Sequence, residues 1–83
     1  KAGKIRGLTV QPKFLLFPSF YRRGVFHHAL NYVGDFLYYD IEKKRKVVED
    51  VKGVETEVFK IKYKLFCFRH NMELRIVKTS EIR

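Results

Sequence analysis

The sequence contains a single cysteine, Cys67, so it can form no internal disulfide, and this scarcity fits a reducing compartment. No stretch approaches the roughly 20 consecutive apolar residues that a membrane span requires. We expect no signal peptide, and the sequence shows no internal repeat and no low-complexity segment. We therefore expect a single domain over residues 1–83, located in the cytoplasm and held together by its apolar core.

Acidic residues are also scarce, because 9 Asp and Glu stand against 18 Lys and Arg, which gives a formal net charge of +9. Such an excess in a short chain favours an anionic partner, nucleic acid first, although a basic surface can also serve solubility alone. The hydrophobic fraction is 46%, with eight Phe and five Tyr, which is enough for one compact core. The composition is that of a globular chain and not of a disordered one.

Most of the chain has the pattern of β-strands. The segments 8–10 and 13–17 are predicted as parts of one edge strand, because Pro12 between them cannot donate to a ladder. A loop or hairpin turn with paired arginines is expected at 18–24, and a charged turn at 41–45. A further strand is predicted to begin within 25–32, and strands are also predicted at 33–39, 46–52 and 72–77.

Residues 54–70 fit two patterns. Apolar residues alternate with lysines from Phe59 to Leu65, which is the period of a strand. Acidic residues at the front and Arg69 at the back instead suit a helix dipole. A helix would also gather Val58, Phe59, Ile61, Leu65, Phe66 and Phe68 on one broad side, with Lys60 and Lys64 opposite. We predict a helix.

Two carboxylates are expected to meet across the hairpin that the charged turn closes. If the turn is centred between Glu42 and Lys43, Asp35 faces Asp50. Directly opposed residues have Cβ atoms about 4.5–5.5 Å apart, so the two carboxylates repel unless a cation or a shared proton offsets their charge. A hard divalent cation such as Mg²⁺ is commonly held by one or two carboxylates and by substrate phosphate.

Strand alternation adds a third residue to this face. Lys52 points to the same side as Asp50, whereas Glu49 points to the other side. A lysine beside a metal site can hold the scissile phosphate or orient the attacking water. A register slip of one residue would reverse the faces, and the alternative is a plain hairpin whose charges are solvated.

The sequences at 34–40 (GDFLYYD) and 47–53 (VVEDVKG) resemble the core signature of PD-(D/E)xK nucleases. More narrowly, they resemble a small phage and prophage family of DUF1064-type endonucleases, related to Holliday junction resolvases. Three further segments match that pattern, at 11–14, 56–57 and 60–66, so the resemblance covers nearly the whole chain.

The resemblance implies an α/β fold, a small mixed sheet flanked by helices with a restriction-endonuclease-like core. It implies that Asp35 and Asp50 bind Mg²⁺ or Mn²⁺ together with the backbone carbonyl of Val51, and that Lys52 is the motif lysine. Such proteins also carry a glutamate on an N-terminal helix, yet no acidic residue precedes Asp35 here, and Gly34 stands where proline or alanine is usual. We expect that helix to be missing and the first residues to be its tail.

The function expected from these features is metal-dependent hydrolysis of phosphodiester bonds in branched or four-way junction DNA, as in recombination. A junction is nearly twofold symmetric, so a homodimer is expected. Lys60, Lys64, Arg22 and Arg23 are candidate contacts to the DNA backbone. The alternatives are a non-catalytic nucleic-acid-binding module and a protein-interaction domain of a phage assembly.

Overall fold

The computed structural model describes residues 4–79, in which seven strands precede a single helix and an eighth strand follows it. Within the described residues, no helix is long and apolar enough to cross a membrane. In chain order the elements are β1 (Ile5–Val10), β2 (Lys13–Phe17), β3 (Phe20–Arg22), β4 (Val25–His27), β5 (Leu30–Val33), β6 (Phe36–Asp40), β7 (Arg45–Lys52), α1 (Glu57–Arg69) and β8 (Glu73–Lys78).

A mixed sheet of four strands carries the predicted hairpin. Its order is β1-β6-β7-β8, where β1, β6 and β7 are antiparallel and β8 runs parallel to β7. Antiparallel neighbours need only short turns, whereas the parallel pair requires a longer crossover, which α1 supplies. The expectation of a small mixed α/β fold is confirmed at this level.

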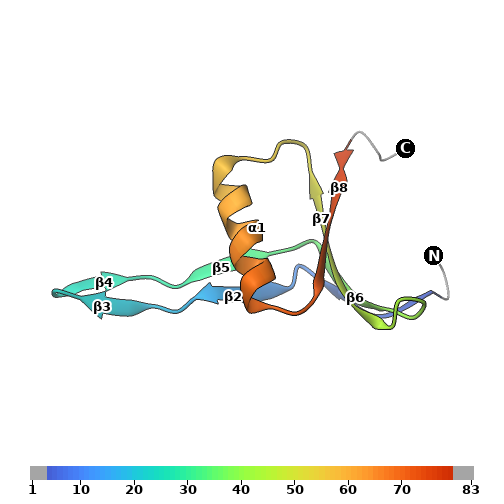
Figure 1. Cartoon of the computed structure of the whole chain (residues 1–83), viewed down its shortest axis with the longest axis horizontal. Coiled ribbons are helices and arrows are strands. Elements are labelled where there is room, and N and C mark those ends of the chain that lie inside the picture. The colour runs from blue at the N-terminus through green and yellow to red at the C-terminus, as the bar shows by residue number, and fades with distance from the viewer. Residues whose placement is uncertain (1–3, 80–83) are drawn as a thin grey trace.

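The first half of the chain forms one continuous two-stranded ribbon (Figure 1). Strands β1, β2 and β3 pair in turn with β6, β5 and β4, and irregularities after Arg6 and after Leu15 each shift the register. A two-residue turn closes the ribbon, with φ of 53° at Arg23 and 77° at Gly24. Two successive positive φ angles are typical of the type I′ turn, whose twist matches that of the flanking strands.

Three strand boundaries differ from the prediction. The segments 8–10 and 13–17 belong to different sheets, because Gln11 adopts a φ of 54° and turns the chain before the buried Pro12. The hairpin turn allowed for at 18–24 is present but shorter than that range: it occupies Arg23 and Gly24, and β3 takes Phe20–Arg22. The strand expected at 33–39 is interrupted at residues 34–35, so Asp35 lies in a break between β5 and β6.

The expected helical tail falls on the first residues, and residues 1–3 lie outside the described part of the chain. From Ile5 onward the chain is strand β1 and not helix.

The core lies where α1 meets both the sheet and the ribbon. Phe14 of the ribbon contacts Phe66 of the helix edge-on, with ring centroids 5.1 Å apart. His70, just after the helix, holds its Nε2 2.9 Å from the carbonyl oxygen of Leu15. The buried cluster draws one residue or more from each layer: Leu16, Tyr32, Val48, Phe59, Phe66 and Leu74. The helix is therefore covered on one side by the sheet and on another by β2 and β5.

The predicted helix is present, and its caps explain its limits. Thr56 is the N-cap, and its hydroxyl accepts a hydrogen bond from the amide of Phe59 at 3.1 Å. The expected apolar side is only partly buried. Phe59 and Phe66 are buried, but Val58, Ile61 and Phe68 are exposed, because β2 and β5 cover only a narrow stripe of the helix.

Candidate active site

The register of the hairpin between β6 and β7 is the predicted one. The ladder pairs Asp40 with Arg45 and ends with Phe36 opposite Glu49, so that Asp35 and Asp50 follow one step beyond its end. The turn explains this register, because Asp40 accepts a backbone hydrogen bond from Lys44 at 2.7 Å and closes the loop tightly. The two carboxylates thus come together where β6 stops and β7 continues.

The Asp35 carboxylate replaces a backbone group at this point. The backbone N–H of Asp35 donates to the carbonyl oxygen of Glu49 at 2.9 Å. Its side-chain Oδ2 accepts the N–H of Val51 at 2.7 Å. A ladder would satisfy that N–H with a backbone carbonyl, so the break in the strand at Asp35 lets a carboxylate line the edge of β7 instead.

Asp50 is the buried charged residue of the described chain, with only 4% of its surface exposed. Its Oδ2 accepts a hydrogen bond from the hydroxyl of Tyr32 and lies 3.3 Å from Nζ of Lys52. Burial raises the pKa of the Asp50 carboxyl, and the negative charge of Asp35 adds to this, while Tyr32 and Lys52 oppose it. A costly buried carboxylate beside a second one is a common signature of a functional site.

Lys52 joins this pair as the strand alternation predicted. Its ammonium also lies 4.6 Å from the centroid of the Phe59 ring, a cation–π contact that holds the long side chain against α1. Lys52 lines a cleft of about 280 Å³ together with Asn31, Thr56 and Lys62, among other residues. Asp35 and Asp50 do not line this cleft, but Lys52 and Tyr32, which both contact Asp50, do.

Tyr32 is the contributor that sequence reasoning missed. It lies on β5, is 3% exposed, and connects the ribbon to Asp50 through its hydroxyl. Burial and the hydrogen bond to Asp50 raise the pKa of Tyr32, so the hydroxyl stays protonated and acts as a donor. A buried tyrosine hydroxyl usually finds a partner. A tyrosine three positions before the first aspartate could have been considered on that ground.

Glu49 lies on the opposite face of the sheet, as the alternation predicted. Its carboxylate Oε2 accepts a hydrogen bond from the hydroxyl of Tyr38 at 2.5 Å, and Nη1 of Arg75 lies 3.4 Å from the same oxygen. Burial, followed by this hydrogen bond, raises the pKa of Tyr38 to about 12.

The residues present suit a hard divalent cation. The Oδ1 atoms of Asp35 and Asp50 accept no hydrogen bond from residues 4–79, since the bonds of both carboxylates use Oδ2. The N–H and C=O of one residue in a strand point to the same side, so the carbonyl of Val51 is directed toward Asp35. No three His, Cys, Asp or Glu side chains converge within the described residues. Water or phosphate oxygens would therefore complete the coordination.

The four predicted DNA-contacting residues lie apart from this site. Lys60 and Lys64 are exposed on α1, and Lys60 lies 3.6 Å from Glu57. Arg22 and Arg23 lie at the closed end of the ribbon, beyond the helix (Figure 1). No ion pair or hydrogen bond joins any of the four to the carboxylates within the described chain.

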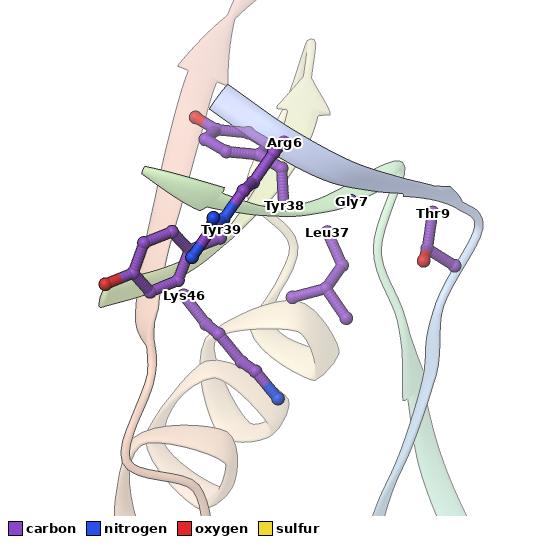
Figure 2. A pocket seen from close by; sticks show the side chains of 7 residues that line it. All are labelled: Arg6, Gly7, Thr9, Leu37, Tyr38, Tyr39 and Lys46. Carbon is purple, nitrogen blue, oxygen red and sulfur yellow. The ribbon is translucent and has the colours of Figure 1, made fainter. Parts of the chain in front are cut away.

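A second hollow, of about 470 Å³, lies against β1 and β6 (Figure 2). The guanidinium of Arg6 lies 4.8 Å from the centroid of the Tyr39 ring there, and the side chain of Lys46 extends away from both (Figure 2). Its lining contains no acidic residue. It therefore offers neither carboxylate ligands nor an acid–base pair, and the carboxylate site is the better candidate for chemistry.

Comparison with curated proteins found no match, and comparison with solved structures found none either. The family model described as "Protein of unknown function (DUF1064)" matches residues 1–82. The match covers the carboxylate pair, the lysine beside it and the whole sheet. The chain therefore belongs to the DUF1064 family.

Proposed function

We propose that this protein is a metal-dependent DNA endonuclease of the PD-(D/E)xK type. The observation that carries the proposal is the buried Asp50, joined to Lys52 at 3.3 Å and set beside Asp35 at the end of the hairpin. Two adjacent carboxylates, one of them buried, make folding less favourable, and such costly groups cluster at functional sites.

The architecture supports the same proposal. A mixed sheet in which the Asp50–Lys52 strand is followed by a helix and a parallel strand fits a restriction-endonuclease-like core. The matching segments of the sequence resemblance fall on this hairpin and on α1. The fold alone could host other activities, so the argument for function depends on the site.

Each residue then has a distinct role. Asp35, Asp50 and the carbonyl of Val51 would hold Mg²⁺ or Mn²⁺. A cation held there lowers the pKa of a bound water and neutralises charge that develops on the phosphate. Lys52 orients the phosphate or the attacking water from the cleft that it lines, and Tyr32 fixes the orientation of the Asp50 carboxylate.

The proposed substrate is branched DNA, including four-way junctions, and the proposed assembly is a homodimer that cuts two matched strands. The net charge of +9 supports a polyanionic substrate. Lys60, Lys64, Arg22 and Arg23 would contribute phosphate contacts away from the cut. Action on DNA in a bacterial host would take place in the cytoplasm.

The test is nicking of a synthetic four-way junction with Mg²⁺ or Mn²⁺, with chelator as the negative control. Asp50→Asn and Lys52→Ala should each lower the rate by at least about 100-fold, the scale of a lost charge-stabilising group. Glu42→Gln and Lys43→Ala, on the exposed turn, are matched controls that should leave the rate unchanged. Nicking that survives Asp50→Asn would exclude the assigned site.

Calorimetric titration of Mn²⁺ separates catalysis from binding. Heat of binding should disappear in the Asp35→Asn/Asp50→Asn double variant, whereas Lys52→Ala should retain it. Tight DNA binding that needs no divalent ion, together with no Mn²⁺ binding and no nicking, would instead identify a non-catalytic nucleic-acid-binding module.

A further inference from the structure

The closed end of the ribbon projects away from the body of the molecule. We refer to residues 18–29, which contain β3 and β4, as the arm; every residue in it is exposed. Figure 1 shows the arm extending beyond α1, with neither the helix nor the four-stranded sheet against it. A two-stranded ribbon with no covered face is marginally stable by itself, so a partner for this surface is expected.

The arm carries aromatic rings on both faces. Phe20 stacks on His27 across the ribbon, with ring centroids 4.6 Å apart and an interplanar angle of 10°. On the other face Tyr21 and Phe26 have centroids 5.0 Å apart. Tyr21 is 73% exposed and Phe26 42% exposed. Tyr21 and Phe26 are tilted by 57° to each other, so their exposed rings do not stack on one another and suit a partner that can stack on them.

Charge selects the kind of partner. No Asp or Glu occurs anywhere before Asp35, whereas Arg22 and Arg23 lie side by side at the turn. The arm of a second copy would bring its own Arg22 and Arg23 and no acidic residue, which opposes pairing of two arms. A polyanion that also offers flat rings meets both requirements, and unpaired nucleotides combine phosphates with exposed base faces.

The ribbon also fixes the distance between the arm and the carboxylates. Strand β5, which leads out of the arm, carries Tyr32, whose hydroxyl binds Asp50. From Tyr32 to Phe26, which pairs with Tyr21, is six residues, or about 20 Å at the usual rise of about 3.3 Å per residue. At the duplex rise of about 3.4 Å, this corresponds to about six base pairs between the two contacts.

We propose that the arm binds unpaired nucleotides about six positions from the carboxylate pair. Tyr21 and Phe26 stack on bases, and Arg22 and Arg23 bind the adjoining phosphates. The position of this contact relative to a cut rests on the proposed endonuclease function, but the binding itself does not. The contact would favour branched or partly single-stranded DNA over continuous duplex.

Fluorescence anisotropy tests the binding on the whole chain. The probes are a fluorescein-labelled single-stranded 20-mer and a blunt duplex of the same sequence, both in chelator so that no cleavage intervenes. We expect Tyr21→Ala/Phe26→Ala to weaken single-strand binding by about 5- to 150-fold per stacked base, and duplex binding by much less. Tyr21→Leu/Phe26→Leu keeps apolar side chains that support the ribbon, and it should show the same selective loss.

The contribution of Arg22 and Arg23 is measured separately, through the salt dependence of single-strand binding. Arg22→Gln/Arg23→Gln should reduce the salt dependence of single-strand affinity by about 1.4 in log–log slope, since each phosphate contact contributes about 0.7. Lys43→Gln/Lys44→Gln removes the same charge from the turn between β6 and β7 and is the matched control. It should leave the preference for single strands unchanged.

Two results would overturn the proposal. One is single-strand affinity that is unaltered in both aromatic double variants. The other is a wild-type dimer, without DNA, that both aromatic double variants convert to monomers in sedimentation experiments, because the arm would then bind a second copy. The two proposals can fail separately. If Asp50→Asn abolishes nicking but the arm variants bind single strands normally, the proposed role of the arm is refuted and the endonuclease function is not. If the arm variants lose single-strand binding but the wild-type chain never nicks DNA, only the endonuclease function is refuted.

Discussion

At the scale of one residue, Asp50 lowers the stability of the fold at the place where a cation site would need a carboxylate. Its carboxylate is buried, and Tyr32 and Lys52 only partly offset the loss of hydration. Removing one partner of a buried ion pair is costly when the other charge stays buried, but the side chain of Lys52 is 28% exposed and keeps contact with water. The same carboxylate, next to Asp35, is what a divalent cation would require. Stability is thus expected to be lower at the site than a purely structural hairpin would need.

Asp50→Asn should therefore stabilise the protein at neutral pH, by about 0.5–2 kcal/mol. The pKa of Asp50 is raised in the folded state, so folding binds a proton, and stability falls as pH rises from about 3.8, the ordinary value, through the folded pKa. The amide has no such dependence, so its advantage should vanish at acidic pH. Urea unfolding at several pH values without divalent ions measures this. A destabilised variant at neutral pH would contradict the raised pKa.

Gly34, directly before the first aspartate, has a steric role. A Cβ built there would lie 2.8 Å from Cγ1 of Val48, which is fully buried. Gly34→Ala should cost about 1–3 kcal/mol, as other overpacked core sites do. Gly53→Ala is the control, since its Cβ would meet only Thr79 Oγ1 at 3.7 Å. Equal unfolding free energies for the two variants in urea would show that Val48 moves aside without cost.

At the scale of elements, α1 depends on its N-cap for the position of the site. Thr56→Ala removes the hydroxyl that accepts the amide of Phe59, and it should cost about 1 kcal/mol. Because Phe59 supports Lys52, Mn²⁺-dependent nicking should fall as well, whereas Thr56→Ser should restore both. Thermal unfolding and nicking rates measure the two effects. A Thr56→Ala variant as stable as wild type would mean that solvent caps this helix equally well.

Local patterns predicted the elements near the site better than those far from it. The charged turn fixed the register of β6 and β7, so the approach of Asp35 to Asp50 followed from counting residues. Helix α1 followed from its terminal charges despite a strand-like alternation. The break at residues 34–35 was not predicted, because the backbone partners there, Pro12 for Gly34 and Glu49 for Asp35, lie on other segments of the chain. The exposed side of α1 was missed for the same reason, since burial depends on which layers cover the helix.

At the scale of the whole molecule, the ribbon is what the sequence could not reveal. Its pairs join residues up to 35 positions apart, as with Ile5 and Asp40, and two register shifts interrupt it. No local period specifies such pairing. The same ribbon crosses α1 and delivers Tyr32 to Asp50, so a residue absent from the motif becomes part of the site.

The ribbon also predicts the shape of the molecule in solution. The radius of gyration of the Cα trace is 15.0 Å, whereas a compact domain of 83 residues would have about 12 Å. Small-angle scattering from monomeric protein at low concentration should give a value near 15.0 Å. Replacing residues 20–27 by an Asn-Gly turn removes most of the arm and should lower the value toward the compact one, because β2, β5 and the site are retained. A full-length value near the compact one would mean that the arm folds back onto the body, where its aromatic rings would be unavailable to unpaired bases.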